Sequence, residues 1–274
     1  MLMASCRLLC FSQIASVFID YDIRMLERLE TSSSRASREY NDKLLDLSFQ
    51  YADTCYHDYY AYFANAIIDN NDNLRKVYGI DNMEYRQAMI ALNNYFLLGR
   101  YVDDNYSNYE ERAVAVLLGL EKYLQQVSSN KEQFLAILSG VYKYHFNDTK
   151  KALAYSKKRL KIAEKDKLHD PTNYAYALSF YIQALADGSR MKDANHEIAK
   201  FANYDGFTES DRELIISMLM SVLDENSPDY IWLQFAQMYA ENENAFVNAI
   251  PSLCKLAENN RYNLMMQLDS IIKR

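Results

Sequence analysis

The chain has 274 residues, of which 50% are apolar, and it contains only six glycines and three prolines. The apolar content excludes a chain that is disordered throughout, and the scarcity of Gly and Pro argues against turn-dense β-sandwiches and glycine-rich nucleotide folds. The net charge of −7 is opposite in sign to that of a typical nucleic-acid-binding protein, so we expect no nucleic-acid partner.

Residues 1–18 are mostly apolar and hold one charged residue, Arg7. Such a stretch has the general form of a secretory signal, but it is too short and too interrupted to predict a stable membrane span. Two interpretations stay open. Residues 1–19 are either a targeting segment of an exported protein or the apolar first helix of a cytoplasmic one, which we favour. The four scattered cysteines form no CxxC pair and are compatible with a reducing compartment.

Residues 20–274 are predicted to form one continuous helical-repeat domain. The chain holds 24 tyrosines, and a tyrosine buries a large ring while keeping a hydroxyl for a polar contact. The densest aromatic cluster comprises Tyr56, Tyr59, Tyr60, Tyr62 and Phe63. Apolar neighbours at helical spacing predict that most of this cluster is core. Tyr59 and Tyr60 are also candidates for lining a ligand groove, since exposed aromatic side chains commonly anchor partners.

Apolar stripes at helical spacing and capping residues predict the next two helices. We expect a helix over 82–101, with Asp81 opening a capping box at its start. The following helix is expected to open at Ser107, with Glu110 as its capping partner, and to carry an apolar stripe as far as Val127.

Further helices are expected over about 131–145 and 149–165. Asp170 then places a capping acid before Pro171 at the first helical position, and this helix is expected to end near Gly188. The remaining helices are expected at about 190–203, 209–224, 228–241, 244–258 and 260–273. Short polar links between about ten helices predict antiparallel neighbours, and the lack of a long crossover favours a solenoid over a bundle.

Residues 130–204 resemble tetratricopeptide repeats. Ala152 comes twelve residues after Gly140 and Leu160 comes twenty after it, as in that family, and Ala194 has the role of Ala152 in the following unit. The resemblance implies an all-α fold of antiparallel helix pairs stacked as an α-solenoid. It also implies that Gly140 lets two helices approach closely, and that a protein or peptide partner binds along a concave face.

Acidic residues in the segment 103–111 have the spacing of a possible metal motif. Asp103, Ser107 and Glu111 are similar in spacing to the second magnesium motif of class I terpene synthases, and carboxylates on one helical face can hold a divalent ion. The same segment is explained more simply by an acidic link and a helix cap. The aspartate-rich partner helix of that family is also missing, so we predict no metal here.

A second metal alternative involves histidines. His145, followed by His169 and Asp170, is similar to the ligand order of helical metal phosphohydrolases, in which imidazoles and carboxylates hold a hydrolytic metal pair. Asp170, however, is expected to cap a helix in front of Pro171. We therefore predict no metal, no cofactor and no catalytic residue in the chain.

A basic stripe runs along the helix expected at 149–165 and is the last candidate site. Lys150, Lys157, Lys161 and Lys165 lie on the side opposite the apolar residues of this helix. The stripe could receive an acidic peptide or a phosphate, but any amphipathic surface helix shows a charged face, and we favour that simpler interpretation.

Together these patterns predict a non-catalytic scaffold or adaptor that binds a protein or peptide, for example in a regulatory or sensing system. The alternative is a metal-dependent, all-helical hydrolase or lyase whose site the motifs do not reveal.

Overall fold

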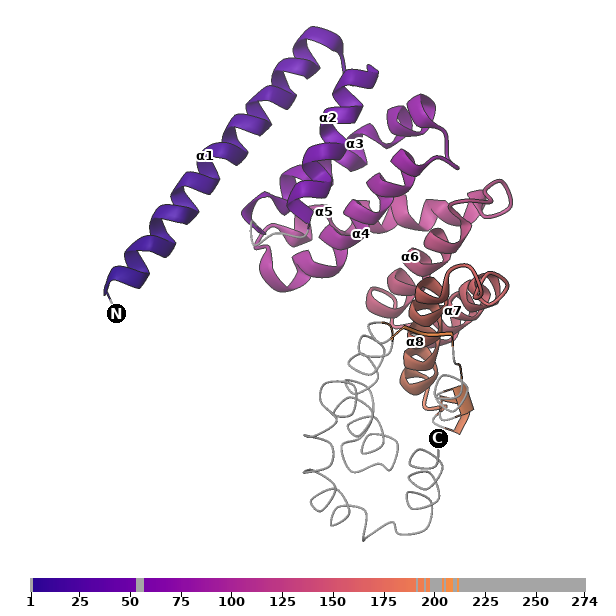
Figure 1. Ribbon diagram of the computed structural model, residues 1–274. Helices are drawn as coiled ribbons and strands as arrows, with labels where there is room; N and C mark the ends of the chain where they lie inside the picture. The colour runs from indigo at the N-terminus through magenta and orange to yellow at the C-terminus, as the bar shows by residue number, and fades with distance from the viewer. Residues whose placement is uncertain are drawn as a thin grey trace. The chain divides into compact units, whose positions relative to one another are not determined.

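The computed structural model describes the helical backbone of residues 2–17 and the full structure of residues 18–52, 57–190, 192–194, 196–197, 204, 206–208 and 211. All regular structure in these residues is helical (Figure 1). The helices predicted from 190–203 onward lie largely or wholly outside this part of the chain. The chain divides into two compact units, Met1–His145 and Phe146–Arg274, which are described separately below.

The first unit consists of six α-helices and two short 3-10 helices within its described residues. They are α1 (Leu2–Ser33), α2 (Arg38–Ala52), η1 (His57–Tyr59), α3 (Tyr60–Tyr78), α4 (Met83–Val102), α5 (Tyr106–Leu118), η2 (Gly119–Tyr123) and α6 (Lys131–Tyr144). The apolar segment at the start of the chain forms the first half of α1. In the described part of the chain, no helix has both the length and the apolar composition that a membrane span requires.

From α2 to α6, each helix packs extensively against the next helix and against the next but one. The links from α2 to α5 are short, which favours antiparallel packing of consecutive helices, whereas the longer link between α5 and α6 contains η2. Their shared core is rich in aromatic rings, and its largest fully buried side chains include Tyr60, Phe63, Tyr85, Tyr95, Phe96, Tyr109 and Phe134. The prediction of an all-helical structure is confirmed for these residues. The bounds of α4 and α6 agree within one residue with the helices expected over 82–101 and 131–145.

Buried tyrosines use their hydroxyls to bond backbone carbonyls inside this core. The Tyr60 hydroxyl donates to the carbonyl of Ala52 at 3.3 Å, and the Tyr109 hydroxyl donates to the carbonyl of Tyr95 at 3.0 Å. The Tyr95 hydroxyl donates in turn to the carbonyl of Ser48. These bonds satisfy polar groups that burial would otherwise penalise. They also explain how a core can hold so many tyrosines.

Two helical glycines differ in the space around them. A Cβ at Gly99 in α4 would lie 1.9 Å from the Tyr109 hydroxyl oxygen, so Gly99 allows the close approach of α5. A Cβ at Gly140 in α6 would meet nothing nearer than the Asn93 side-chain oxygen, at 4.0 Å. Within the first unit, Gly140 therefore does not mark a close approach of two helices. The helix pair that the repeat resemblance implied joins α6 to the helix expected at 149–165 in the other unit, and it stays a prediction.

The predicted caps of α4 and α5 are wrong. Asp81 does not cap its own helix, which begins after Asn82. Its carboxylate instead accepts bonds from the backbone amides of Ser128 and Asn130, both at 3.0 Å, in the link before α6. Ser107 lies inside α5, which begins at Tyr106. The spacing of residues in the sequence identified hydrogen-bond acceptors near the helix starts. The packing of the helices decided which backbone amides donate to those acceptors.

The helix expected to continue to Val127 ends earlier. Regular α-helix stops at Leu118, and a 3-10 helix begins at Gly119. Glycine costs about 1 kcal/mol relative to alanine inside a helix, which makes this a favourable place for the change. Leu120 and Val127 remain buried, so the apolar stripe still anchors the segment to the core.

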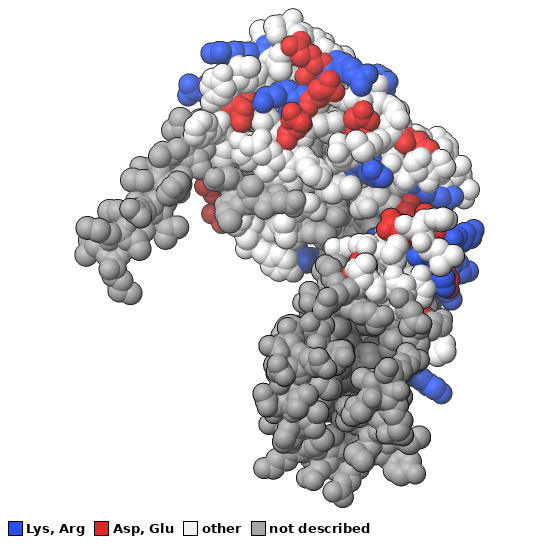
Figure 2. All heavy atoms as spheres, in the orientation of Figure 1, with Lys and Arg blue, Asp and Glu red and all other residues white. Residues whose placement is uncertain are grey.

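The second unit begins with the pair α7 (Thr149–Ala163) and α8 (Pro171–Asp187), which pack against each other. The Asp170 carboxylate caps α8 by accepting from the Asn173 amide at 2.9 Å, and Gly188 follows the last turn, as predicted. The core of the pair includes Ala194, one of the two repeat alanines. The basic stripe is exposed to solvent, and Figure 2 shows Lys and Arg side chains gathered where Figure 1 draws α7.

Candidate functional site

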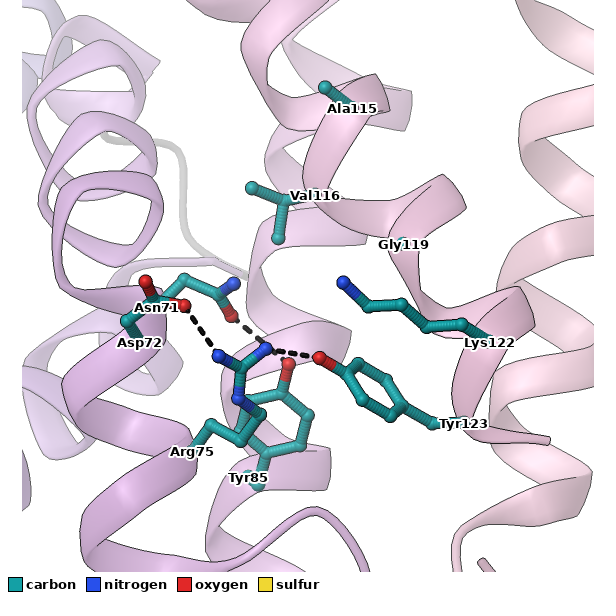
Figure 3. A pocket seen from close by; sticks show the side chains of 9 residues that line it. All are labelled: Asn71, Asp72, Arg75, Tyr85, Ala115, Val116, Gly119, Lys122 and Tyr123. Atoms are coloured by element: carbon teal, nitrogen blue, oxygen red, sulfur yellow. Dashed lines mark hydrogen bonds and ion pairs between the residues drawn. The ribbon is translucent and has the colours of Figure 1, made fainter. Parts of the chain in front are cut away.

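The first unit contains a recess of about 230 Å³ (Figure 3). Its lining comes from α3, α4, α5 and η2 and comprises Asn71, Asp72, Arg75, Tyr85, Ala115, Val116, Gly119, Lys122 and Tyr123. The lining thus combines two cationic side chains, one carboxylate, two tyrosines and a small apolar wall. None of these residues is a histidine, cysteine or serine, so the lining lacks the Ser–His and Cys–His pairs that activate a nucleophile.

Local helix geometry places these side chains. Asn71 and Arg75 are four residues apart on α3 and therefore lie on one face of that helix. On the opposite side, the change to 3-10 geometry at Gly119 directs η2 so that Lys122 and Tyr123 line the recess. The recess therefore depends on the early end of α5.

Arg75 is held in place by two neighbours. Its Nη2 lies 2.8 Å from Asp72 Oδ1, and its Nη1 donates to the Tyr123 hydroxyl, as the dashed lines in Figure 3 show. Its guanidinium carbon also lies 5.5 Å from the centroid of the Tyr123 ring. The Asp72 side chain is 73% exposed, so this ion pair adds little stability. Its effect is to orient the guanidinium toward the recess.

Lys122 supplies the second cation. Its Nζ lies 5.0 Å from the centroid of the Tyr123 ring, and Figure 3 shows it extending toward the interior of the recess. The ion pairs found among the described residues do not include Lys122. Because Asp72 balances only one of the two cations, the lining carries a net positive charge.

Tyr85 forms the floor of the recess. Its side chain is 1% exposed, and its hydroxyl donates to Asn71 Oδ1 at 3.0 Å. Burial raises the pKa of Tyr85 well above its ordinary value, so the hydroxyl stays protonated and keeps this bond. Val116 and Ala115 provide the apolar wall. The arrangement suits an anionic group carried on an apolar stem.

The aromatic residues singled out from the sequence lie elsewhere. Tyr60 is 1% exposed and belongs to the core, where a ligand cannot reach its ring. Tyr59 is half-buried, and its hydroxyl donates to Asp20 Oδ1 at 3.2 Å. Neither residue lines the recess. Tyr56 lies outside the described residues.

The basic stripe is a solvated surface of α7 and the turn that follows it. Lys150, Lys157, Lys161 and Lys165 are all exposed. They lie in the second unit and are not among the residues that line the recess.

The acidic segment at 103–111 does not form one helical face. Asp103 lies before α5, is 8% exposed, and accepts from the Asn105 amide at 2.8 Å. Ser107 and Glu111 are exposed positions of α5. Over the described part of the chain, no three His, Cys, Asp or Glu side chains are grouped as a metal site.

His145 has carboxylate neighbours that the sequence pattern missed. Its Nδ1 lies 3.0 Å from Glu110 Oε1, and its Nε2 lies 3.7 Å from Glu111 Oε1. Glu110 therefore bonds to a residue at the end of α6 rather than capping α5. His169 is exposed in the second unit, and Asp170 caps α8.

The recess was not evident from the sequence. Arg75 and Lys122 are 47 residues apart and look like ordinary surface charges, and Gly119 within an apolar stretch was the one local signal. No protein-family model matches the chain, and no curated protein shows significant similarity to it. The function must therefore be argued from the site itself.

Proposed function

We propose that this protein is a non-catalytic scaffold or adaptor that binds a protein or peptide, with helix pairs stacked in the manner of a tetratricopeptide α-solenoid. In the described part of the first unit, the extensively packed helix pairs are one or two places apart along the chain. Such nearest-neighbour packing supports an open stack rather than a closed bundle. An open stack presents surface along its length for a partner.

The recess is the observation that carries the proposal. Pockets that enclose a small-molecule ligand typically measure about 300–1,000 Å³. At about 230 Å³, the recess is below that range and fits a single partner side chain better than a whole substrate. Its rim includes the exposed residues Asp72, Ala115 and Lys122, which a partner can reach.

Site-specific photo-crosslinking tests the proposal. A benzoylphenylalanine at Ala115, on the rim, is expected to capture a defined partner from the native cell extract. The same probe at Asp104, which is exposed and does not line the recess, is the control. Equal capture at both positions, or none at Ala115, would contradict binding at the recess. Metal-dependent turnover of a phosphoester or prenyl diphosphate by the purified protein would contradict the non-catalytic assignment.

A further inference from the structure

Two cations share one aromatic ring in the recess. The Arg75 guanidinium and the Lys122 ammonium lie 5.5 Å and 5.0 Å from the centroid of the Tyr123 ring. The quadrupole of the ring stabilises each cation, but it does not remove the repulsion between them. An anion bound between the two side chains would interact favourably with both (Figure 3). The net positive charge of the recess is opposite in sign to the net charge of the chain, which is −7.

The donors for such an anion are already oriented. Asp72 and the Tyr123 hydroxyl hold the guanidinium of Arg75, so little side-chain freedom is lost when a ligand binds. A guanidinium has five N–H donors and an ammonium has three, so both groups retain donors for a ligand. Lys122 is exposed and can close onto the bound anion.

The charge balance selects the type of anion. With Asp72 in the lining, the net charge of the side chains is that of a single cation, which a singly charged carboxylate neutralises. A phosphate monoester carries about −1.5 to −2 charges at neutral pH, and its excess charge would face the Asp72 carboxylate. The apolar wall of Ala115 and Val116 suits the methylene groups of an acidic side chain.

We propose that the recess binds a carboxylate of a peptide partner, with Lys122 as its ion-pair donor and Arg75 as its oriented second donor. The carboxylate comes from a Glu or Asp side chain or from the C-terminus of the peptide. This inference rests on the proposed function.

Peptide arrays test the inference with the full-length protein. The probes are short random peptides with a central Glu, Gln or phosphoserine, each synthesised with a free or an amidated C-terminus. We expect binding to the central-Glu or free-C-terminus set to exceed that of its neutral counterpart by about two- to fivefold, as for a partly exposed ion pair. Lys122→Gln and Arg75→Gln should each abolish this preference, and Arg75→Lys should weaken it.

Matched variants separate this site from other basic surfaces. Lys76→Gln changes an exposed cation on the same helix as Arg75, and Lys157→Gln changes the basic stripe of α7; both should keep the preference. Circular dichroism checks that each variant is folded.

The array results test carboxylate recognition by the recess separately from peptide binding in general. A preference for a free C-terminus that is lost in Lys122→Gln supports the inference and identifies the chain end as the source. Peptide binding without a carboxylate preference, a stronger preference for phosphoserine, or a preference that survives Lys122→Gln would overturn the inference and leave the scaffold proposal standing. No binding to any peptide by the wild-type protein would count against both.

Discussion

Gly99 shows how one missing side chain permits close packing. The Tyr109 hydroxyl occupies the place where a Cβ would stand, and it is fixed there by its bond to the Tyr95 carbonyl. Tyr109 is fully buried, so its ring has no open space to move into. Alanine would raise the intrinsic helix propensity at this position, but the steric clash is the larger effect.

Gly99→Ala is therefore expected to lower the free energy of unfolding by about 1–3 kcal/mol. Gly140→Ala is the matched control, because its Cβ has space within the first unit, and it should raise stability by about 0.5–1 kcal/mol. Urea denaturation followed by circular dichroism measures both. Adding Tyr109→Phe to Gly99→Ala should recover part of the loss, since it removes the clashing oxygen. Equal effects of the two glycine substitutions would refute this account of the α4–α5 contact.

Hydrogen bonds connect one link between helices to another. Asp81, in the link between α3 and α4, accepts from the Ser128 hydroxyl at 2.8 Å and from two backbone amides in the link before α6. Burial by itself would raise the pKa of Asp81, but the hydrogen bonds from Ser128, Ser129 and Asn130 outweigh it and hold the pKa below its ordinary value of 3.8. The ionised carboxylate therefore favours the folded state.

Asp81→Ala should destabilise the protein at pH 7 by about 0.5–1 kcal/mol, the lower part of the range for a capping carboxylate because the site is partly open to solvent. A lowered pKa means that this contribution is present above pH 3.8 and is lost as the pH falls through the pKa of the folded state. The difference in urea midpoint between Asp81→Ala and the wild type should therefore become smaller as the pH is lowered toward 3. Asp104→Ala, at an exposed acid in another link, is the control and should have no effect at either pH.

The tyrosine-rich interior makes the whole molecule sensitive to alkali. Burial is the main cause that raises the pKa of many tyrosines, and it brings the pKa of Tyr62 to about 12. The others with a raised pKa are Tyr40, Tyr59, Tyr78, Tyr85, Tyr106, Tyr109 and Tyr174. Because the neutral phenol favours the folded state, this stability is complete below the unfolded pKa of 10.0 and declines as the pH rises through the folded values.

Ionisation of these tyrosines should therefore accompany unfolding. Above about pH 11, we expect tyrosinate absorbance to increase as the far-ultraviolet helical signal decreases. This pH lies between the tyrosine pKa values of the unfolded and the folded state. The urea midpoint of unfolding should already fall between about pH 10 and pH 11. Tyrosines that all titrate near pH 10 while the helical signal stays constant would contradict the buried network of hydroxyls.

The two units have separate hydrophobic cores. The core of the first unit extends from Ile19 to Val141, and the core of the second includes residues from Leu160 to Phe207. A unit with its own core can fold independently. We expect a chain of residues 1–145 to be helical and to unfold cooperatively on heating, as measured by circular dichroism. A fragment without a cooperative transition would show that the first unit needs the rest of the chain.

Local interactions allowed much of the helical layout to be predicted from the sequence. The cap of α8 by Asp170, its first-turn Pro171 and its end before Gly188 each involve residues within a few positions of one another. The bounds of α6 and α7, expected at about 131–145 and 149–165, likewise agree within two residues with the spacing of apolar residues. The low content of Gly and Pro indicated the helical class.

The candidate site, in contrast, was decided by tertiary packing. Arg75 and Lys122 meet at Tyr123 only because α3 packs against α5, and the partners of Asp81 lie 47 to 49 residues away. The end of α5 at Gly119 likewise depends on where the buried side chains on either side are held. Short-range spacing determines which residues share a helical face, whereas contacts between distant residues depend on how the helices pack together. For this reason the sequence by itself determined the helical class and the approximate bounds of α4, α6, α7 and α8, and only the tertiary structure decided where α5 ends and assembled the recess.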